Sequence, residues 1–272
     1  MPYDYRKKCK GEINMQSVTK RIEELLISNR EALLQADTSI SETQNGICSD
    51  GIVDEECFYI QPQRAIFLLK ETNGNDSRGK ARESYNNWDY RGWLQHQQAN
   101  SELGDEENSN TFYKTFYNVC MYLDVFYDVL ADKCIPYEEY MASGRFNTEI
   151  LRKNLRKTAI INLKKTWGGG STEWKALNNY LQNEKVLEVL RKEITYINPD
   201  VVICGGKKVF DFAKKIFGGE EQELPITGAF KANYFQTDNS VFLSFYHPSC
   251  RKKRRDLYDC SAEVFRTLHT LL

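Results

Sequence analysis

The chain has 272 residues, of which 41% are hydrophobic and 28% charged, and its formal net charge is −1. That length and composition predict one large domain with a sizeable buried core. No run reaches the roughly 18 apolar residues that span a bilayer, and the N-terminus lacks the apolar segment of a signal peptide, so we expect a soluble, cytoplasmic protein. Eight cysteines without a CxxC pair and only three histidines predict reduced thiols, no bound metal and no other cofactor.

Residues 1–62 carry the signals of an N-terminal helical extension. Apolar residues recur at helical spacing over residues 16–35, which predicts an amphipathic helix. Residues 37–51 are polar and rich in turn formers, so they predict a loop, and residues 58–60 predict a short strand. We therefore expect the main domain to occupy residues 63–272.

Four apolar runs predict buried strands. They lie at residues 64–69, 157–163, 200–204 and 241–246. The first run leads directly to Lys70 and Glu71, and the second reaches Asn162 near its end. Pro248 ends the fourth run because proline has no backbone N–H, which leaves His247 where the chain leaves the sheet.

Helical periodicity separates these runs and also follows the last of them. The predicted helices cover residues 111–131, 173–198, 207–217 and 256–272. Residues 75–109 form a long polar insertion that contains several aromatic residues. These aromatics either pack down as a lid or offer stacking surfaces, and packing is the favoured interpretation.

Alternating strands and helices predict an α/β fold with a four-stranded parallel sheet flanked by helices on both sides. The carboxyl ends of parallel strands share one edge, and open α/β sheets bind ligands along that edge. We therefore expect Glu71, Asn162 and His247 to lie together there, although they are far apart in the sequence.

Five consecutive basic residues follow the fourth apolar run: Arg251, Lys252, Lys253, Arg254 and Arg255. In a chain whose net charge is only −1, such local charge predicts contact with a polyanion. The alternative is a solvated loop beside the edge of the sheet.

Four stretches of the chain resemble motifs of the uracil-DNA glycosylase superfamily. KETNG at 70–74 is similar to its first motif, IINLKKT at 160–166 to its second strand motif, YINPDVVICGG at 196–206 to its connecting helix and strand, and YHPSCR at 246–251 to its His-Pro-Ser motif. The order and spacing agree, and the similarity runs from about residue 65 to the C-terminus. Residues 1–62 and 75–109 have no counterpart in the family.

The chain also departs from the family pattern. Lys70 and Asn73 replace a glycine and a proline of the first motif, and Cys250 replaces a common proline. The iron–sulfur cysteines of some branches are absent, so no cluster is expected. These departures keep two alternatives open: a non-catalytic nucleic-acid-binding module of the same fold, and an enzyme that acts on free nucleosides or nucleotides.

The resemblance implies a DNA glycosylase that hydrolyses the N-glycosidic bond of uracil or another altered base and leaves an abasic site. Glu71 would orient water or stabilise the cationic sugar, and His247 would donate a hydrogen bond to the departing base. Asn162 would pair with the Watson–Crick edge of a flipped base. The other residues expected to bind substrate are Lys70, Thr72, Asn73, Gly74 and Ser249.

DNA, single- or double-stranded, is the partner that the resemblance implies, and we expect the protein to act as a monomer without a membrane partner. Arg251 occupies the position from which some family members insert a side chain into the gap left by the flipped base. Lys252, Lys253, Arg254 and Arg255 would then contact phosphates beside the lesion.

Overall fold

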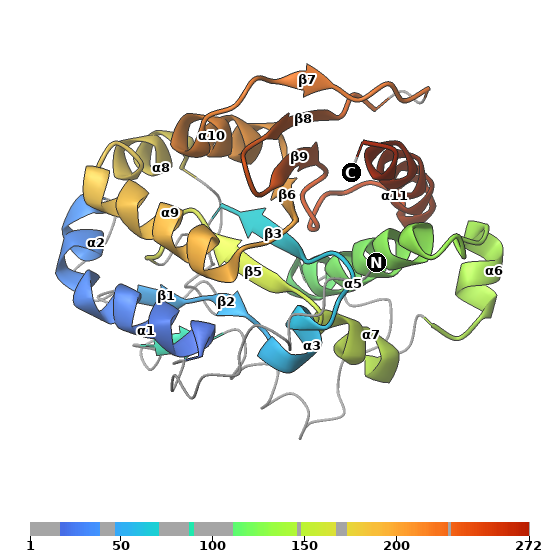
Figure 1. Cartoon of the computed structure of the whole chain (residues 1–272), viewed down its shortest axis with the longest axis horizontal. Helices are drawn as coiled ribbons and strands as arrows, with labels where there is room; N and C mark the ends of the chain where they lie inside the picture. The colour runs from blue at the N-terminus through green and yellow to red at the C-terminus, as the bar shows by residue number, and fades with distance from the viewer. Residues whose placement is uncertain are drawn as a thin grey trace.

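The computed structural model of the chain describes residues 17–38, 47–70, 87–89, 111–145, 148–166, 173–227 and 230–271. Within these residues seven strands form one mixed sheet in the order β2-β5-β3-β6-β9-β8-β7 (Figure 1). The strands are β2 (Gly51–Ile52), β3 (Ala65–Leu69), β5 (Ala159–Asn162), β6 (Val201–Gly205), β7 (Gln222–Glu223), β8 (Asn233–Gln236) and β9 (Val241–Phe245). Two further short strands, β1 (Ile47–Ser49) and β4 (Asn87–Asp89), pair in parallel with each other.

The four predicted strands occupy the centre of this sheet as β5, β3, β6 and β9, and each pairs in parallel with its neighbour. All their residues are buried, which is typical of parallel strands covered on both faces. The α/β class is therefore confirmed. Three antiparallel strands extend this sheet: β2 adds to one edge, and β8 and β7 add to the other. The apolar runs did not predict β2 or β7, whereas β8 falls in residues 224–238, which have some strand propensity.

Helices cover both faces of the sheet (Figure 1). One face carries α5 (Thr111–Leu130) and α11 (Arg254–His269), with α6 (Tyr137–Ala142) and α7 (Thr148–Leu155) beside them. The apolar side chains between α5, α11 and the sheet, which we call the α5 core, include Phe67, Leu69 and Phe245. No helix in the described part of the chain is both long and apolar enough to cross a membrane.

The opposite face carries α1 (Val18–Ser28), α2 (Arg30–Ala36), α8 (Trp174–Tyr180), α9 (Glu184–Ile197) and α10 (Lys207–Phe217). Its apolar interior, which we call the α9 core, joins Ile22 and Leu33 of the N-terminal helices to Ile66 and Leu68 of β3. The described residues of the segment predicted as an N-terminal extension therefore share a core with the central sheet.

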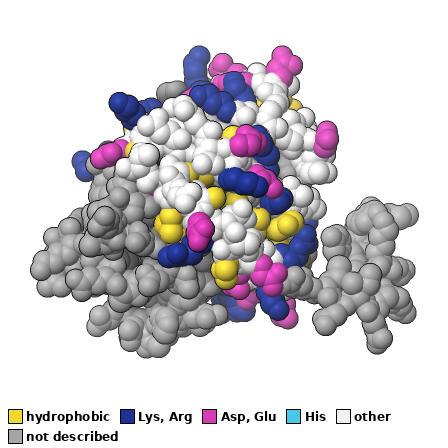
Figure 2. Space-filling model, turned by 90° about the vertical axis from the view of Figure 1, so that its left-hand side faces the viewer, with side chains coloured by type: hydrophobic (Ala, Val, Ile, Leu, Met, Phe, Trp, Pro, Cys, Tyr) yellow, Lys and Arg dark blue, Asp and Glu magenta, His cyan; other side chains and the backbone are white. Residues whose placement is uncertain are grey.

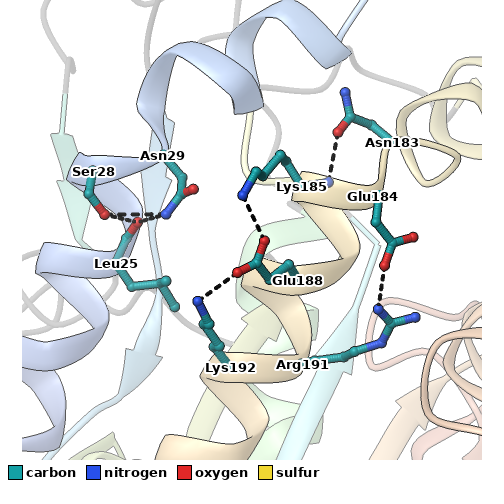
Figure 3. Close-up of polar contacts among 9 residues, drawn as sticks. All are labelled: Leu25, Ser28, Asn29, Asn183, Glu184, Lys185, Glu188, Arg191 and Lys192. Atoms are coloured by element: carbon teal, nitrogen blue, oxygen red, sulfur yellow. Dashed lines mark hydrogen bonds and ion pairs between the residues drawn. The ribbon is translucent and has the colours of Figure 1, made fainter.

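Two predicted helices are each broken by an asparagine, as Figure 3 shows. Residues 16–35 form α1 and α2, because the side-chain and backbone N–H groups of Asn29 both donate to the carbonyl of Leu25 and end the first helix. Residues 173–198 form α8 and α9, because the side-chain oxygen of Asn183 accepts the N–H of Lys185 and starts a new helix. Asparagine favours such ends, because its side chain competes for backbone hydrogen bonds.

Two further predictions are corrected. The short strand expected at residues 58–60 is wrong: Glu55–Tyr59 is the helix α3, capped by the Asp54 carboxylate, which accepts the N–H of Cys57 at 2.9 Å. The last helix begins at Arg254 rather than at residue 256. Its first turn therefore contains Arg254 and Arg255, the last two residues of the basic run.

Candidate active site at the carboxyl edge of the sheet

The carboxyl ends of β5, β3, β6 and β9 lie side by side and bring distant polar residues to one edge. Leu69 pairs with Asn162 across β3 and β5, and Gly205 pairs with Phe245 across β6 and β9. Lys70 follows β3 directly, and its carbonyl accepts the N–H of Lys164 at 2.9 Å. The strand ends that carry Asn162 and His247 therefore share this edge, with β3 and β6 between them.

A tight turn after β9 holds His247 at the edge. The N–H of Cys250 donates to the carbonyl of His247 at 2.9 Å and closes the turn around Pro248. The Asn118 side chain, which is buried on α5, donates to the carbonyl of Pro248 at 2.5 Å. The turn is thus anchored both to itself and to a helix of the α5 core.

Ser249 determines which ring nitrogen of His247 carries the proton. Its backbone N–H lies 3.1 Å from Nδ1, and since an N–H can only donate, Nδ1 must be an acceptor. The Ser249 hydroxyl lies 2.7 Å from the same nitrogen and donates to it as well. The neutral ring therefore carries its proton on Nε2, which leaves that nitrogen as a donor.

The environment keeps this imidazole neutral. Burial, and after it the positive charge of Lys70, lowers the pKa of His247 to about 4. Both causes act against the imidazolium form, because one removes solvent and the other adds a like charge. His247 is consequently a neutral hydrogen-bond donor at neutral pH, and Lys70 is close enough to act on it.

Gly205 provides the space that the ring occupies. A Cβ at this position would lie 2.8 Å from Cδ2 of Leu69 and 3.1 Å from Cδ2 of His247. The imidazole therefore lies over the end of β6, on the face of the α5 core. It stands two strands away from β5, a separation of about 10 Å at the usual spacing of strands.

Asn162 ends β5 and is 1% exposed. Its side chain shares a face of the sheet with Ile160, two residues earlier, which belongs to the α5 core. Asn162 and His247 thus lie on the same face, with Leu69 and Gly205 between them. The Asn162 backbone N–H donates to Oδ2 of Asp50 at 2.5 Å.

Several predicted site residues lie outside the described part of the chain: Glu71, Thr72, Asn73 and Gly74, together with most of the insertion at residues 75–109. Their predicted roles stay predictions. Of the proposed substrate-binding residues, Lys70, Asn162 and Ser249 are described, and Ser249 contacts the catalytic candidate His247 itself.

The basic run begins at the turn after His247. Arg251, Lys252 and Lys253 are exposed, and the Lys252 ammonium lies 5.5 Å from the ring centroid of Tyr246. Arg254 and Arg255 form the first turn of α11. Arg255 also pairs with Glu138 at 2.8 Å and with Asp259 at 3.7 Å, both on the surface, where such pairs contribute little stability.

The sequence analysis missed a group of buried charges beside Asn162, formed by Asp50, Lys165 and Glu193. All three side chains are fully buried. One signal was present in the sequence, because Glu193 lies on the apolar stripe of α9 defined by Val186, Val189, Leu190 and Ile197. A carboxylate on such a stripe predicts a buried partner.

Among the described residues, no group of three or more His, Cys, Asp or Glu side chains is placed to hold a metal ion. Comparisons of the chain with models of known protein families, with curated proteins and with solved structures found no match. The geometry of this edge and the sequence motifs that form it therefore indicate the function.

Proposed function

We propose that this protein is a DNA glycosylase that hydrolyses the N-glycosidic bond of uracil or another altered base and leaves an abasic site. The observation that carries the proposal is the geometry that holds His247, from which we infer a neutral ring. Its Nδ1 accepts from Ser249, its pKa lies at about 4, and its Nε2–H is therefore a neutral donor at the ligand-binding edge of an α/β sheet.

A neutral hydrogen-bond donor can stabilise a base as it leaves the sugar. When the bond between the sugar and the base nitrogen breaks, its electron pair goes to the base, and negative charge develops on a base oxygen. The Nε2–H of His247 stabilises that charge by hydrogen bonding, a contribution commonly worth about 3 to 4 kcal/mol in sites of this kind. The nearby charge of Lys70 favours the same anion.

Asn162 stands across the edge from His247 on the same face. A carboxamide offers a donor and an acceptor in one plane, so it can pair with a base held between the two side chains. A carboxylate is still needed to orient the attacking water and to stabilise the cationic sugar. In this proposal Glu71, which follows Lys70, has that role.

The basic run supports DNA as the partner. Arg251, Lys252 and Lys253 are exposed beside the turn that holds His247, so they can contact the phosphates of a bound nucleic acid, whereas Arg255 already pairs with Glu138 and Asp259. By contrast, Figure 2 shows acidic and basic side chains interspersed on the face that includes α9. We expect the enzyme to act as a cytoplasmic monomer whose basic run contacts phosphates.

The test uses single- and double-stranded oligonucleotides that carry uracil, hypoxanthine or a modified cytosine, followed by alkali to cut abasic sites. We expect at least one of these bases to be released by the wild type and not by His247→Ala. His269→Ala, which removes an exposed histidine of α11, is the matched control and should keep full activity.

Equal cutting by wild type and His247→Ala for every base would refute the glycosylase proposal. Tight binding of DNA without cutting would favour the non-catalytic module. Release of bases from free nucleosides, with little DNA affinity even at low salt, would favour the nucleoside enzyme.

A further inference from the structure

Asp50 lies at an interruption in the antiparallel pairing beside β5, which resumes at Ile47↔Thr166. The antiparallel strand β2 pairs with β5 only at Gly51↔Ile160 and Ile52↔Ala159, so the ladder stops before Asn162. At this interruption Oδ2 of Asp50 accepts the Asn162 N–H at 2.5 Å. A side chain from the neighbouring segment thus fixes the backbone where the candidate base-reading residue stands.

The same carboxylate also binds Lys165, three residues further along the segment. Lys165 Nζ lies 2.8 Å from Oδ1 and 3.0 Å from Oδ2 of Asp50. Both side chains are fully buried, so neither charge is compensated by water. Asp50 therefore holds residues 162–165 at both ends.

Glu193 completes what we call the buried triad of Asp50, Lys165 and Glu193. Its Oε2 lies 2.7 Å from Lys165 Nζ, and α9 carries it into the interior. Two carboxyls face one ammonium in the triad, and burial raises the pKa of Glu193 to about 8, so it keeps its proton at neutral pH. The triad is then electrically neutral.

A second buried pair continues along the same segment. Lys164 Nζ lies 2.8 Å from Oδ2 of Asp37, and the Thr166 hydroxyl donates to the same carboxylate. The Tyr180 hydroxyl accepts the backbone N–H of Lys165 at 3.2 Å. Every residue from 164 to 166 is therefore held by a group from a helix or from a helix end on the α9 side of the sheet.

We propose that Asp50, supported by Lys165 and Glu193, is a positioning residue that aims the Asn162 carboxamide at the base. This inference rests on the proposed function for its substrate, but its geometry does not. Stability alone explains the triad poorly, because buried ion pairs are often no more stable than well-packed apolar side chains. The hydrogen bond from the Asn162 backbone N–H to Asp50 instead links the triad to the position of Asn162 at the edge of the sheet.

Asp50→Ala removes the acceptor of the Asn162 N–H and is expected to fold, because Lys165 keeps Glu193 as its partner. Hydrogen exchange of the Asn162 amide should accelerate by at least about tenfold, while amides of β6 and β9 change much less. Asp50→Asn keeps an oxygen at this place and should restore most of the protection. Asp54→Ala removes a carboxylate that accepts a different backbone N–H, that of Cys57, and serves as the matched control.

The second measurement is base discrimination, which a merely structural loss would not alter. In Asp50→Ala the ratio of kcat/KM for the released base over a normal pyrimidine should fall by about tenfold or more, since small misplacements at a reacting centre have effects of this size. In Asp54→Ala that ratio should stay as in the wild type.

The inference is overturned if Asn162 exchanges at the wild-type rate in Asp50→Ala, or if its change is no larger than that of β6 and β9. It is also overturned if an active Asp50→Ala enzyme keeps wild-type discrimination. If the wild type releases no base, the proposed function fails, and the exchange measurement alone decides whether Asp50 positions Asn162.

Discussion

Glu193→Gln tests the charge balance of the buried triad. Burial raises the pKa of this carboxyl to about 8; the ammonium of Lys165 opposes the rise and the carboxylate of Asp50 adds to it. Glutamine keeps the size of the side chain. Its amide can donate a hydrogen bond to a carboxylate such as Asp50, and its oxygen can accept one from Lys165.

The direction in which stability changes with pH follows from proton binding. A carboxyl whose pKa is higher in the folded chain than in the unfolded chain binds more protons when folded, so the free energy of unfolding falls as pH rises from 4.5 to about 8. One proton gives a slope of about 1.4 kcal/mol per pH unit, and the whole window corresponds to about 4 to 5 kcal/mol. The stabilisation is complete below pH 4.5 and is lost above pH 8. The variant has no such loss.

Urea unfolding followed by far-UV circular dichroism, at constant ionic strength from pH 5 to pH 9, measures the difference. Wild type and Glu193→Gln should have similar stability at pH 5, and the variant should be the more stable protein at pH 9. Asp124, whose pKa burial raises to about 6, titrates equally in both proteins and cancels from the difference.

Glu188→Gln is the control on the exposed face of the same helix (Figure 3). Glu188 pairs with Lys185 and Lys192, and hydrogen bonds to these lysines lower its pKa to about 2, so it stays ionised over the whole range. Its replacement should shift stability equally at every pH. Parallel curves for wild type and Glu193→Gln would mean that Glu193 is ionised at neutral pH, and the reasoning about the triad would be refuted.

Three further predictions concern the edge itself. Lys70→Met should raise the pKa of His247, because it removes the like charge that adds to burial, and an NMR titration of the imidazole that gives an unchanged pKa would contradict this. Gly205→Ala places a Cβ 3.1 Å from the imidazole, so it should lower the free energy of unfolding by about 1 to 3 kcal/mol and slow base release. If thermal denaturation and kinetics were unaltered, the ring would not lie where the structure places it. The double change Lys252→Gln and Lys253→Gln should flatten the dependence of log DNA affinity on log salt by about one unit per lost phosphate contact. An unchanged slope would mean that these lysines are solvated and do not contact phosphates.

The central sheet could be predicted because each of its parallel strands carries its own signal. The run AIFLL of β3 is apolar at every position, and the same holds for VVIC in β6. Such runs indicate burial on both faces without reference to any partner. The two residues of β2 and the two of β7 are too few to carry a comparable signal, and β2 in addition pairs with β5, which lies far away in the sequence.

The site could be predicted only in part, for a similar physical reason. Asn162 and His247 stand at strand ends that the apolar runs and Pro248 define, so their place at the edge followed from the sequence. Asp50 lies in a stretch that reads as a polar loop, and its burial depends on Lys165, 115 residues away. Turn-forming composition describes local preference, whereas a buried ion pair is decided by tertiary contacts.

The two sides of the edge make different demands on a ligand. Around His247 and Lys70, a neutral hydrogen-bond donor beside a positive charge favours a group that gains negative charge during the reaction. Because the pKa of His247 is lowered, the ring is not an imidazolium at neutral pH and cannot transfer a proton from that form to the ligand. In the proposed function the Asn162 carboxamide would select by hydrogen-bond direction rather than by charge, because the raised pKa of Glu193 favours a neutral triad beside it. A heterocyclic base that is neutral when bound and anionic when it leaves satisfies both demands. The proposed cleavage supplies such a ligand, whereas a permanently charged ligand would satisfy only the side of His247.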